Sequence, residues 1–215
     1  MNSKRQNLEY TARIICKAAG PYKSNLIGRK FLYIFDNRYI EVIYKTNNFK
    51  HLTGVESELS AKDFFKLAKR GKLSYKNIYF SSTHPFQLSM KKLKHLNDIV
   101  KLSTSESFML EEIKTNTKTY KFGTTDLNFT LCFNQLTDAY ENSVYHVESL
   151  RDGDCFSKSR TVYNVNAILY KKNDSKTYDH CAFLDKNFKF DDIPNSVRKL
   201  CTDDLLTELS KSQKT

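Results

Sequence analysis

The sequence predicts an α+β fold, in which helical and mixed elements come first and antiparallel strands follow. Helix-type spacing of apolar residues prevails before residue 100, whereas residues 108–184 alternate with a period of two. This segregation is typical of α+β proteins, because a parallel doubly wound sheet requires strands and helices to alternate. Only 3 Pro and 6 Gly occur in 215 residues, which argues against long linkers.

The first part of the chain carries one helix signal and one hairpin signal. The spacing of apolar residues predicts a helix over Ser3–Ala19, which Gly20-Pro21 is expected to end. A hairpin should follow, with strands over Lys30–Phe35 and Tyr39–Lys45. The next stretch, Asn48–Val55, is too polar and too interrupted by glycine to be an ordinary strand.

Two more helices are expected before the main run of strands, and one after it. Ser60-Ala61-Lys62-Asp63 is a capping-box pattern that opens a short helix, which Gly71 closes. Pro85 opens the second helix, and Pro194 opens a last one that reaches Leu209. The expected strands are Asn77–Phe80, Phe108–Ile113, Thr119–Gly123, Leu127–Phe133, Val144–Leu150, Val162–Lys171 and Lys176–Leu184.

The charge of the chain points to a polyanionic partner. The net charge is +11 and the pI is near 9.3, and nucleic acid is the commonest partner of such proteins. The alternative is a lysine-rich surface that only keeps the protein soluble. We favour nucleic acid, because aromatic residues that can stack on bases are interleaved with the basic ones.

Cysteine spacing and hydropathy predict a cytoplasmic protein with reduced thiols. The five cysteines are odd in number and form no CxxC pair, and we expect most of them in the core. The polar start of the sequence does not resemble a signal peptide, and no apolar run approaches the length of a membrane span. We therefore expect no membrane partner.

Several common kinds of catalytic site are missing from the sequence. It contains no GxxxxGK[ST] loop, no GxGxxG after a strand, no HExxH and no zinc-type spacing of Cys and His. The acidic residues form no DxD-type pair on a strongly apolar strand, which leaves a two-metal nuclease with little support. We therefore expect no metal, nucleotide or other cofactor. A Cys–His nucleophile pair stays open, although nothing marks a cysteine as activated.

His51-Leu52-Thr53-Gly54 is the first candidate for chemistry. RNA carries its own nucleophile, the 2′-hydroxyl, so a protein can cleave it without metal by moving two protons and stabilising the phosphorane. Leu52 would anchor the segment, and a tight turn at Gly54 would leave His51 and Thr53 facing outward. Histidine suits proton transfer at neutral pH. A turn histidine hydrogen-bonded to the backbone is the alternative, which spacing alone favours.

Ser157-Lys158-Ser159-Arg160 is the second candidate, because it lies between two expected strands. Hydroxyls beside a lysine and an arginine suit a phosphate clamp, and a solvated polar turn fits equally well. His84 precedes Pro85 and is interpreted only as part of a helix start. Other basic residues would either extend a phosphate-tracking surface or simply stay solvated: Lys66, Lys69, Arg70, Lys91 and Lys94.

The region around His51 resembles a known family. The stretch Glu41–Val55 (EVIYKTNNFKHLTGV), followed by an aromatic helix and Lys72-Leu73, looks like the phage group of barnase–EndoU–colicin–RelE-like endoribonuclease domains, specifically its fourth type. That pattern runs strand, F-x-HLxG, short aromatic helix, G-K-L and a lysine-bearing helix. A later basic and serine-containing turn also fits, as FSKSR ahead of Ala167–Tyr170. The resemblance covers roughly Tyr33 to Leu184.

The resemblance implies a fold, a division of the chain and a site. The implied fold is barnase/RelE-like, with N-terminal helices packed on an antiparallel sheet. Residues 1–30 would be a helical extension, 31–190 the nuclease-like domain, and 191–215 a C-terminal helix and tail. The implied activity is metal-independent RNA cleavage, with His51 as acid or base and Thr53 beside it. The implied phosphate contacts are Ser157, Ser159 and Arg160, with Lys158 or Lys91 as auxiliaries.

Three functions remain open at this point. The first is an endoribonuclease of a phage or mobile element, directed in a bacterial host at a defence RNA such as a CRISPR guide RNA. The second is a non-catalytic anti-CRISPR-like protein that binds and blocks a ribonucleoprotein such as Cas9. The third is an interaction protein whose charge only solubilises it. RNA cleavage in EDTA that is lost in His51→Ala would separate the first from the others.

Overall fold

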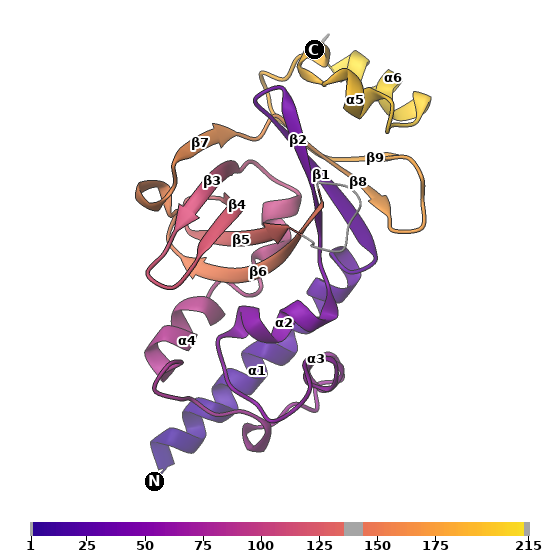
Figure 1. Cartoon of the computed structure of the whole chain (residues 1–215). Helices are drawn as coiled ribbons and strands as arrows, with labels where there is room; N and C mark the ends of the chain where they lie inside the picture. The colour runs from indigo at the N-terminus through magenta and orange to yellow at the C-terminus, as the bar shows by residue number, and fades with distance from the viewer. Residues whose placement is uncertain (1, 136–143, 213–215) are drawn as a thin grey trace.

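The computed structural model describes residues 2–135 and 144–212 and has an α+β fold (Figure 1). The helices are α1 (Asn2–Asn25), α2 (Thr46–Thr53), α3 (Ala61–Lys69), α4 (Phe86–Leu93), α5 (Asn195–Arg198) and α6 (Asp203–Lys211). The strands are β1 (Arg29–Phe35), β2 (Arg38–Ile43), β3 (Phe108–Lys114), β4 (Thr119–Thr125), β5 (Phe129–Gln135), β6 (Val144–Asp152), β7 (Thr161–Asn164), β8 (Ala167–Lys172) and β9 (His180–Leu184). Short 3-10 helices cover Tyr75–Asn77, Ile99–Ser103, Phe156–Lys158 and Phe190–Asp192.

The strands of the described residues form one curved sheet in the order β7-β3-β4-β5-β6-β2-β1-β8-β9. All neighbours are antiparallel except β2 and β6, which run parallel where Glu41–Ile43 pairs with Val144–His146. The expectation of a purely antiparallel sheet is therefore wrong at this one place. The connection from β2 to β6 holds helices α2, α3 and α4 and strands β3, β4 and β5, and a long crossover permits parallel pairing.

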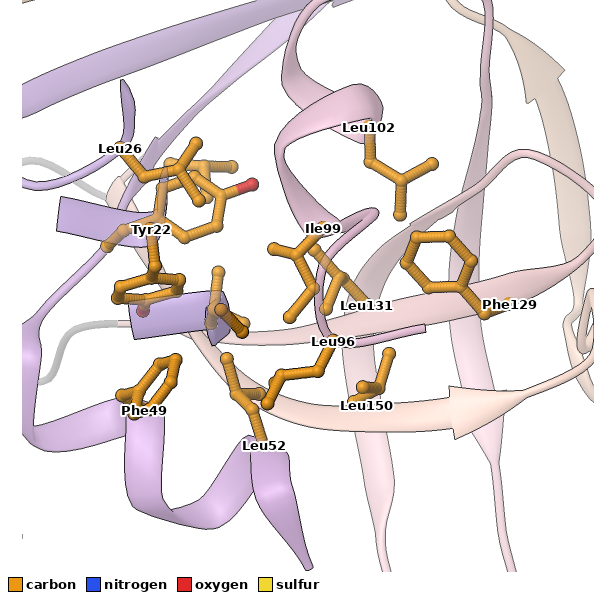
Figure 2. Close-up of a cluster of buried hydrophobic side chains, with 14 of the residues drawn as sticks. Tyr22, Leu26, Phe49, Leu52, Leu96, Ile99, Leu102, Phe129, Leu131 and Leu150 are labelled. Carbon is orange, nitrogen blue, oxygen red and sulfur yellow. The ribbon is translucent and has the colours of Figure 1, made fainter. Parts of the chain in front are cut away.

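The main core lies between the N-terminal helices and the concave part of the sheet. Figure 2 shows side chains of α1 and α2, such as Tyr22 and Leu52, facing side chains of β5 and β6, such as Leu131 and Leu150. Each of these four side chains is at most 1% exposed. Burial of apolar area on this scale is the main stabilising contribution to such a fold. It also fixes α2 against β6, where the candidate site lies.

The first helix is longer than its sequence predicts. It continues through Gly20 and Pro21 to Asn25 instead of ending at Ala19. Proline lacks a backbone donor, and in a helix interior it removes a hydrogen bond. Tertiary packing compensates here, because Tyr22, just after the proline, and Leu26, directly after the helix, are both buried. None of the described helices is both long and apolar enough to cross a membrane.

Two expected elements are divided in the structure. The expected strand Val162–Lys171 is two strands, β7 and β8, at opposite sides of the sheet. The break falls where Val165 and Asn166 donate backbone hydrogen bonds to Ser107 and Ile34, 3.1 and 2.8 Å away. The expected C-terminal helix is likewise α5 and α6, separated at Cys201, which forms an isolated bridge with Tyr178. None of the five cysteines forms a disulfide, and Cys132, Cys155 and Cys201 are buried as expected.

A second, smaller core attaches the C-terminal helices to the sheet. Leu205 and Leu209 of α6 pack with Leu32 and Leu169, which lie on β1 and β8. The Tyr178 hydroxyl, fully buried, donates a hydrogen bond of 2.5 Å to Glu41. Glu41 is also 3.5 Å from the ammonium of Lys30. Burial and the Glu41 carboxylate both raise the pKa of Tyr178, so its hydroxyl keeps its proton and remains a donor.

Replacing Tyr178 by phenylalanine is expected to destabilise the protein by about 1.5–3 kcal/mol, because it removes a buried hydrogen bond to a charged group. Denaturant unfolding followed by circular dichroism measures this change. Tyr163→Phe is the matched control, since its hydroxyl donates to Glu111 at a partly buried position. If both variants lost the same free energy of unfolding, the burial of the Tyr178–Glu41 pair would contribute nothing to stability.

Candidate functional site

A cleft with a volume of about 550 Å³ lies between the helices and the sheet. One wall comes from α2, α4 and the segment before α4, and the other comes from β6 and its neighbours. The lining residues are His51, Thr83, His84, Leu88, Lys91, Lys92, Thr117, Tyr120, Glu148, Ser149, Leu150, Arg151, Asp152 and Lys158. Segments distant in sequence thus supply basic and imidazole side chains to one concave surface.

His51 reaches the cleft from the last turn of α2, so the HLTG stretch is helical and not a turn. Phe49 and Leu52 are fully buried, which fixes the opposite face of this short helix in the core and leaves His51 exposed. The expectation that Thr53 also faces outward is wrong. Its side chain is buried, donating to the carbonyl of Lys50 at 2.6 Å and accepting from the amide of Val55 at 3.3 Å.

Gly54 brings α2 close to α4. It ends α2 with φ of 68°, a left-handed conformation that glycine adopts without strain. Its carbonyl accepts a hydrogen bond of 2.6 Å from the buried hydroxyl of Ser89. A Cβ atom at this position would lie 2.8 Å from Cδ of Lys92. The glycine therefore allows the Lys92 side chain to pass along the helix end into the cleft.

Gly54→Ala is expected to destabilise the protein by about 1–2 kcal/mol, because alanine is strained at positive φ and its methyl group displaces Lys92. Thermal unfolding measures the loss. Gly71→Ala is the matched control, since it has φ of +67° with no atom within 4 Å of the added Cβ. A larger loss at position 71 than at position 54 would contradict close packing against Lys92.

Lys92 and Arg151 form the electropositive floor of the cleft. Both side chains are partly buried, and neither forms an ion pair with a carboxylate of the described residues. Burial and the nearby Arg151 charge lower the pKa of Lys92 from 10.5 to about 8. Arg151 donates from Nη2 to the Tyr120 hydroxyl at 3.2 Å, which orients its guanidinium. Two mutually repelling cations without a counter-charge favour an anionic ligand.

The two acidic side chains of the cleft are already paired with cations. Glu148 binds Lys118 and Asn134. Asp152 lies 2.6 Å from Lys94 and 2.9 Å from His95. Although partial desolvation raises the pKa of Asp152, the hydrogen bonds from Lys94 and His95 outweigh it and lower that pKa. The carboxylates consequently leave the charge of Lys92 and Arg151 uncompensated.

The structure brings three of the sequence-predicted basic residues to this cleft. His51, Lys91 and Lys158 line it together, and Lys91 and Lys158 are exposed at its rim without an ion-pair partner in residues 2–135 and 144–212. Lys94 lies outside the lining and is engaged by Asp152. The predicted basic residues of α3 and its end are exposed away from the cleft lining: Lys66, Lys69 and Arg70.

The remaining predicted phosphate contacts lie outside the cleft lining. Ser159 donates its hydroxyl to the carbonyl of Cys155 at 2.8 Å, which stabilises the turn. Ser157 is exposed on the short 3-10 helix. The guanidinium of Arg160 lies 3.3 Å from the Glu112 carboxylate and is 70% exposed. Of the four residues in this turn, only Lys158 lines the cleft.

Sequence reasoning missed several of the residues that define the cleft. Arg151 follows directly after the expected strand Val144–Leu150, so a basic residue at a strand end was the available signal. Lys92 was hidden among four basic residues in KKLKH, where only its position opposite Gly54 distinguishes it. His84 was interpreted as part of a helix start, yet its Nδ1 lies 2.6 Å from Oε1 of Glu56. That contact joins two loops and has no local sequence signature.

Comparison with known proteins assigns the family. A family model described as "phage-Barnase-EndoU-ColicinE5/D-RelE like nuclease4" matches residues 14–187, a span that contains every lining residue of the cleft. No curated protein and no solved structure matches the chain. The match covers well over half of the 215 residues. The chain therefore belongs to the phage-Barnase-EndoU-ColicinE5/D-RelE like nuclease family, type 4.

Proposed function

We propose that this protein is a metal-independent endoribonuclease that cleaves RNA by attack of the 2′-hydroxyl on the adjacent phosphorus. The observation that carries the proposal is the pair Lys92 and Arg151, two partly buried cations without a carboxylate partner in the described chain, in the same cleft as His51. Membership of a nuclease-like family supports a phosphodiester as the anion. A histidine that lines the cleft supports proton transfer to or from it.

The proposed reaction needs only groups that line the cleft. The 2′-oxygen forms a bond to phosphorus and loses its proton, and the bond from phosphorus to the 5′-oxygen breaks as that oxygen gains a proton. The products are a 2′,3′-cyclic phosphate and a 5′-hydroxyl. Lys92 and Arg151 would stabilise the negative charge of the phosphorane, because cations that are already in position act strongly on developing charge. His51 would transfer one of the two protons.

Lys91 and Lys158 would bind the phosphates that flank the cleaved bond. They lie at the rim, on α4 and on the turn before β7, and both are exposed. Contacts of this kind add affinity that falls with salt and carry no sequence information. Arg160 and the two serines of the same turn would contact RNA only beyond the cleft. The proposed phosphate-binding residues therefore differ from those that the family resemblance implies.

The finer points of the assignment are proposals on the same footing. We propose a barnase/RelE-like arrangement of the helices on the sheet, with 1–30 as an extension, 31–190 as the nuclease-like domain and 191–215 as a C-terminal addition. The family description names phage proteins, which supports an origin in a phage or mobile element. The substrate would then be a host RNA in the bacterial cytoplasm, such as a CRISPR guide RNA.

The test is incubation of the purified protein with guide RNA, tRNA and rRNA fragments in EDTA, followed by mapping of the ends. We expect cleavage that leaves 2′,3′-cyclic phosphate ends. An RNA with a single 2′-deoxy nucleotide 5′ to the mapped bond should resist cleavage at that bond. Intact RNA in this panel would overturn the proposal. If the intact RNA or a Cas9 ribonucleoprotein is bound in a salt-sensitive manner, the non-catalytic blocking protein takes its place.

A further inference from the structure

His84 is the second imidazole of the cleft, and its backbone is held on both sides. Its amide donates to the Ser81 hydroxyl at 3.0 Å, and its carbonyl accepts from the Ser81 amide at 3.1 Å. Pro85 follows directly and begins the approach to α4. These contacts make the position of His84 independent of a ligand, although the residue lies in a loop.

The His84 ring is oriented by a carboxylate. Its Nδ1 lies 2.6 Å from Oε1 of Glu56, closer than the 3.5 Å to the Thr83 hydroxyl. Glu56 is itself fixed, because its amide and carbonyl each bond to Tyr79 at 3.0 Å. The His84 and Glu56 side chains are 40% and 32% exposed, so the pair is not sealed in the core, and His84 lines the cleft.

This pairing determines which nitrogen is available for chemistry. An ionised carboxylate only accepts hydrogen bonds, so the proton of the neutral ring resides on Nδ1 and the lone pair on Nε2. A carboxylate on Nδ1 also stabilises the imidazolium that forms when Nε2 takes up a proton. His51 differs, because it has no hydrogen-bond partner among the described residues.

We propose that His84 is the general base of the reaction, with Glu56 as its positioning residue and His51 as the general acid. The inference rests on the proposed function. Nε2 of His84 removes the proton of the 2′-hydroxyl as the oxygen bonds to phosphorus. His51 gives its proton to the 5′-oxygen as the bond from that oxygen to phosphorus breaks. The ribonucleotide on the 5′ side of the cleaved bond would thus face the wall that carries His84.

The experiment compares two RNAs that differ at one atom. One is an ordinary RNA containing the mapped cleavage site, and the other has sulfur in place of the bridging 5′-oxygen, a leaving group that departs without protonation. His84→Ala is expected to lower cleavage of both RNAs by about 10²–10⁴-fold. His51→Ala should lower cleavage of the ordinary RNA by a similar factor, and the sulfur-containing RNA should recover most of that loss.

The controls separate the failure of this inference from the failure of the proposed function. A wild-type protein that cuts neither RNA overturns both. A wild-type protein that cuts, with His84→Ala equally fast, overturns only the role of His84, and recovery of His84→Ala on the sulfur-containing RNA reverses the two assignments. His180→Ala is the matched histidine control, since His180 is exposed on β9 outside the cleft. Thermal unfolding of each variant shows whether a loss of activity reflects a loss of folded protein. His84→Gln is measured in the same way as a second, polar replacement of His84.

The role of Glu56 has its own readout. Glu56→Gln keeps an oxygen acceptor for Nδ1 but removes the charge that stabilises the imidazolium. We expect a decrease of about 10-fold or more in kcat with little change in KM, because the interaction strengthens only as the proton is transferred. A change confined to KM, or parallel to a loss of thermal stability, would assign Glu56 to the fold and not to the base.

Discussion

Replacing His51 by alanine is expected to lower kcat/KM for RNA cleavage by about 10²–10⁴-fold, because the variant lacks one of the two groups proposed to transfer protons. The change should leave folding intact. His51 is exposed and makes no hydrogen bond among the described residues, and surface substitutions of this kind usually stay within about 0.5 kcal/mol. Single-turnover cleavage and denaturant unfolding of the same preparation measure the two effects.

Thr53→Val is the matched comparison within the same helix. The valine keeps the shape of threonine but removes the hydroxyl that caps the carbonyl of Lys50 and accepts from the amide of Val55. We expect a loss of about 1–3 kcal/mol in stability with little effect on the cleavage step. If Thr53→Val slowed cleavage as strongly as His51→Ala without changing stability, the buried, structural position of Thr53 would not account for it.

Replacing Lys92 by methionine is expected to change stability and activity in opposite directions. Methionine matches the length of the lysine stem and has no charge, so it removes the desolvation cost of a buried ammonium. The shift of the pKa from 10.5 to about 8 corresponds to roughly 3 kcal/mol at neutral pH, which sets the upper limit of the gain. Loss of the cation proposed to stabilise the phosphorane should lower kcat by about 10²–10³-fold.

The pH dependence of stability tests the same shift independently. Because the folded pKa of Lys92 is lowered, the unfolded chain binds more protons between about pH 8 and pH 10.5. The Lys92 contribution is therefore unfavourable below pH 8 and disappears as the pH rises through this window. The free energy of unfolding should therefore rise between about pH 8 and pH 10.5, and Lys92→Met should make this rise smaller. Lys91→Met, an exposed neighbour on α4, should leave the profile unchanged, and an equal effect at both positions would contradict the burial of Lys92.

Elements with a local signal were predictable from the sequence. The β1–β2 hairpin forms where it is expected, and Ser60 caps α3 by accepting from the amide of Asp63 at 3.1 Å. The division of Val162–Lys171 between two sheet positions was not predictable from the local sequence pattern. Which strand each half pairs with depends on distant partners, β3 for one and β1 for the other.

The site was predictable only in part, for the same reason. The HLTG pattern predicted that Leu52 is buried and that His51 faces outward, and in the structure Leu52 is buried and His51 lines the cleft. It could not show that the motif is the end of a helix, which turns Thr53 inward. The arginine on the floor of the cleft is Arg151 and not Arg160, because β6 is a neighbour of β2 in the sheet while β7 lies at its far edge.

Because β2 pairs with β6, which is far away in the sequence, the cleft can form only late in the synthesis of the chain. His51 follows β2 closely and leaves the ribosome early, whereas Arg151 and Lys158 stand at the end of β6 and after it. Domains made from contacts so distant along the chain assemble only when the later partner has been made. A nascent chain without β6 would hold His51 and Lys92 but not Arg151, so the proposed phosphate site would be incomplete. Until β6 has been made, the nascent chain would therefore be unable to cleave RNA by the proposed mechanism.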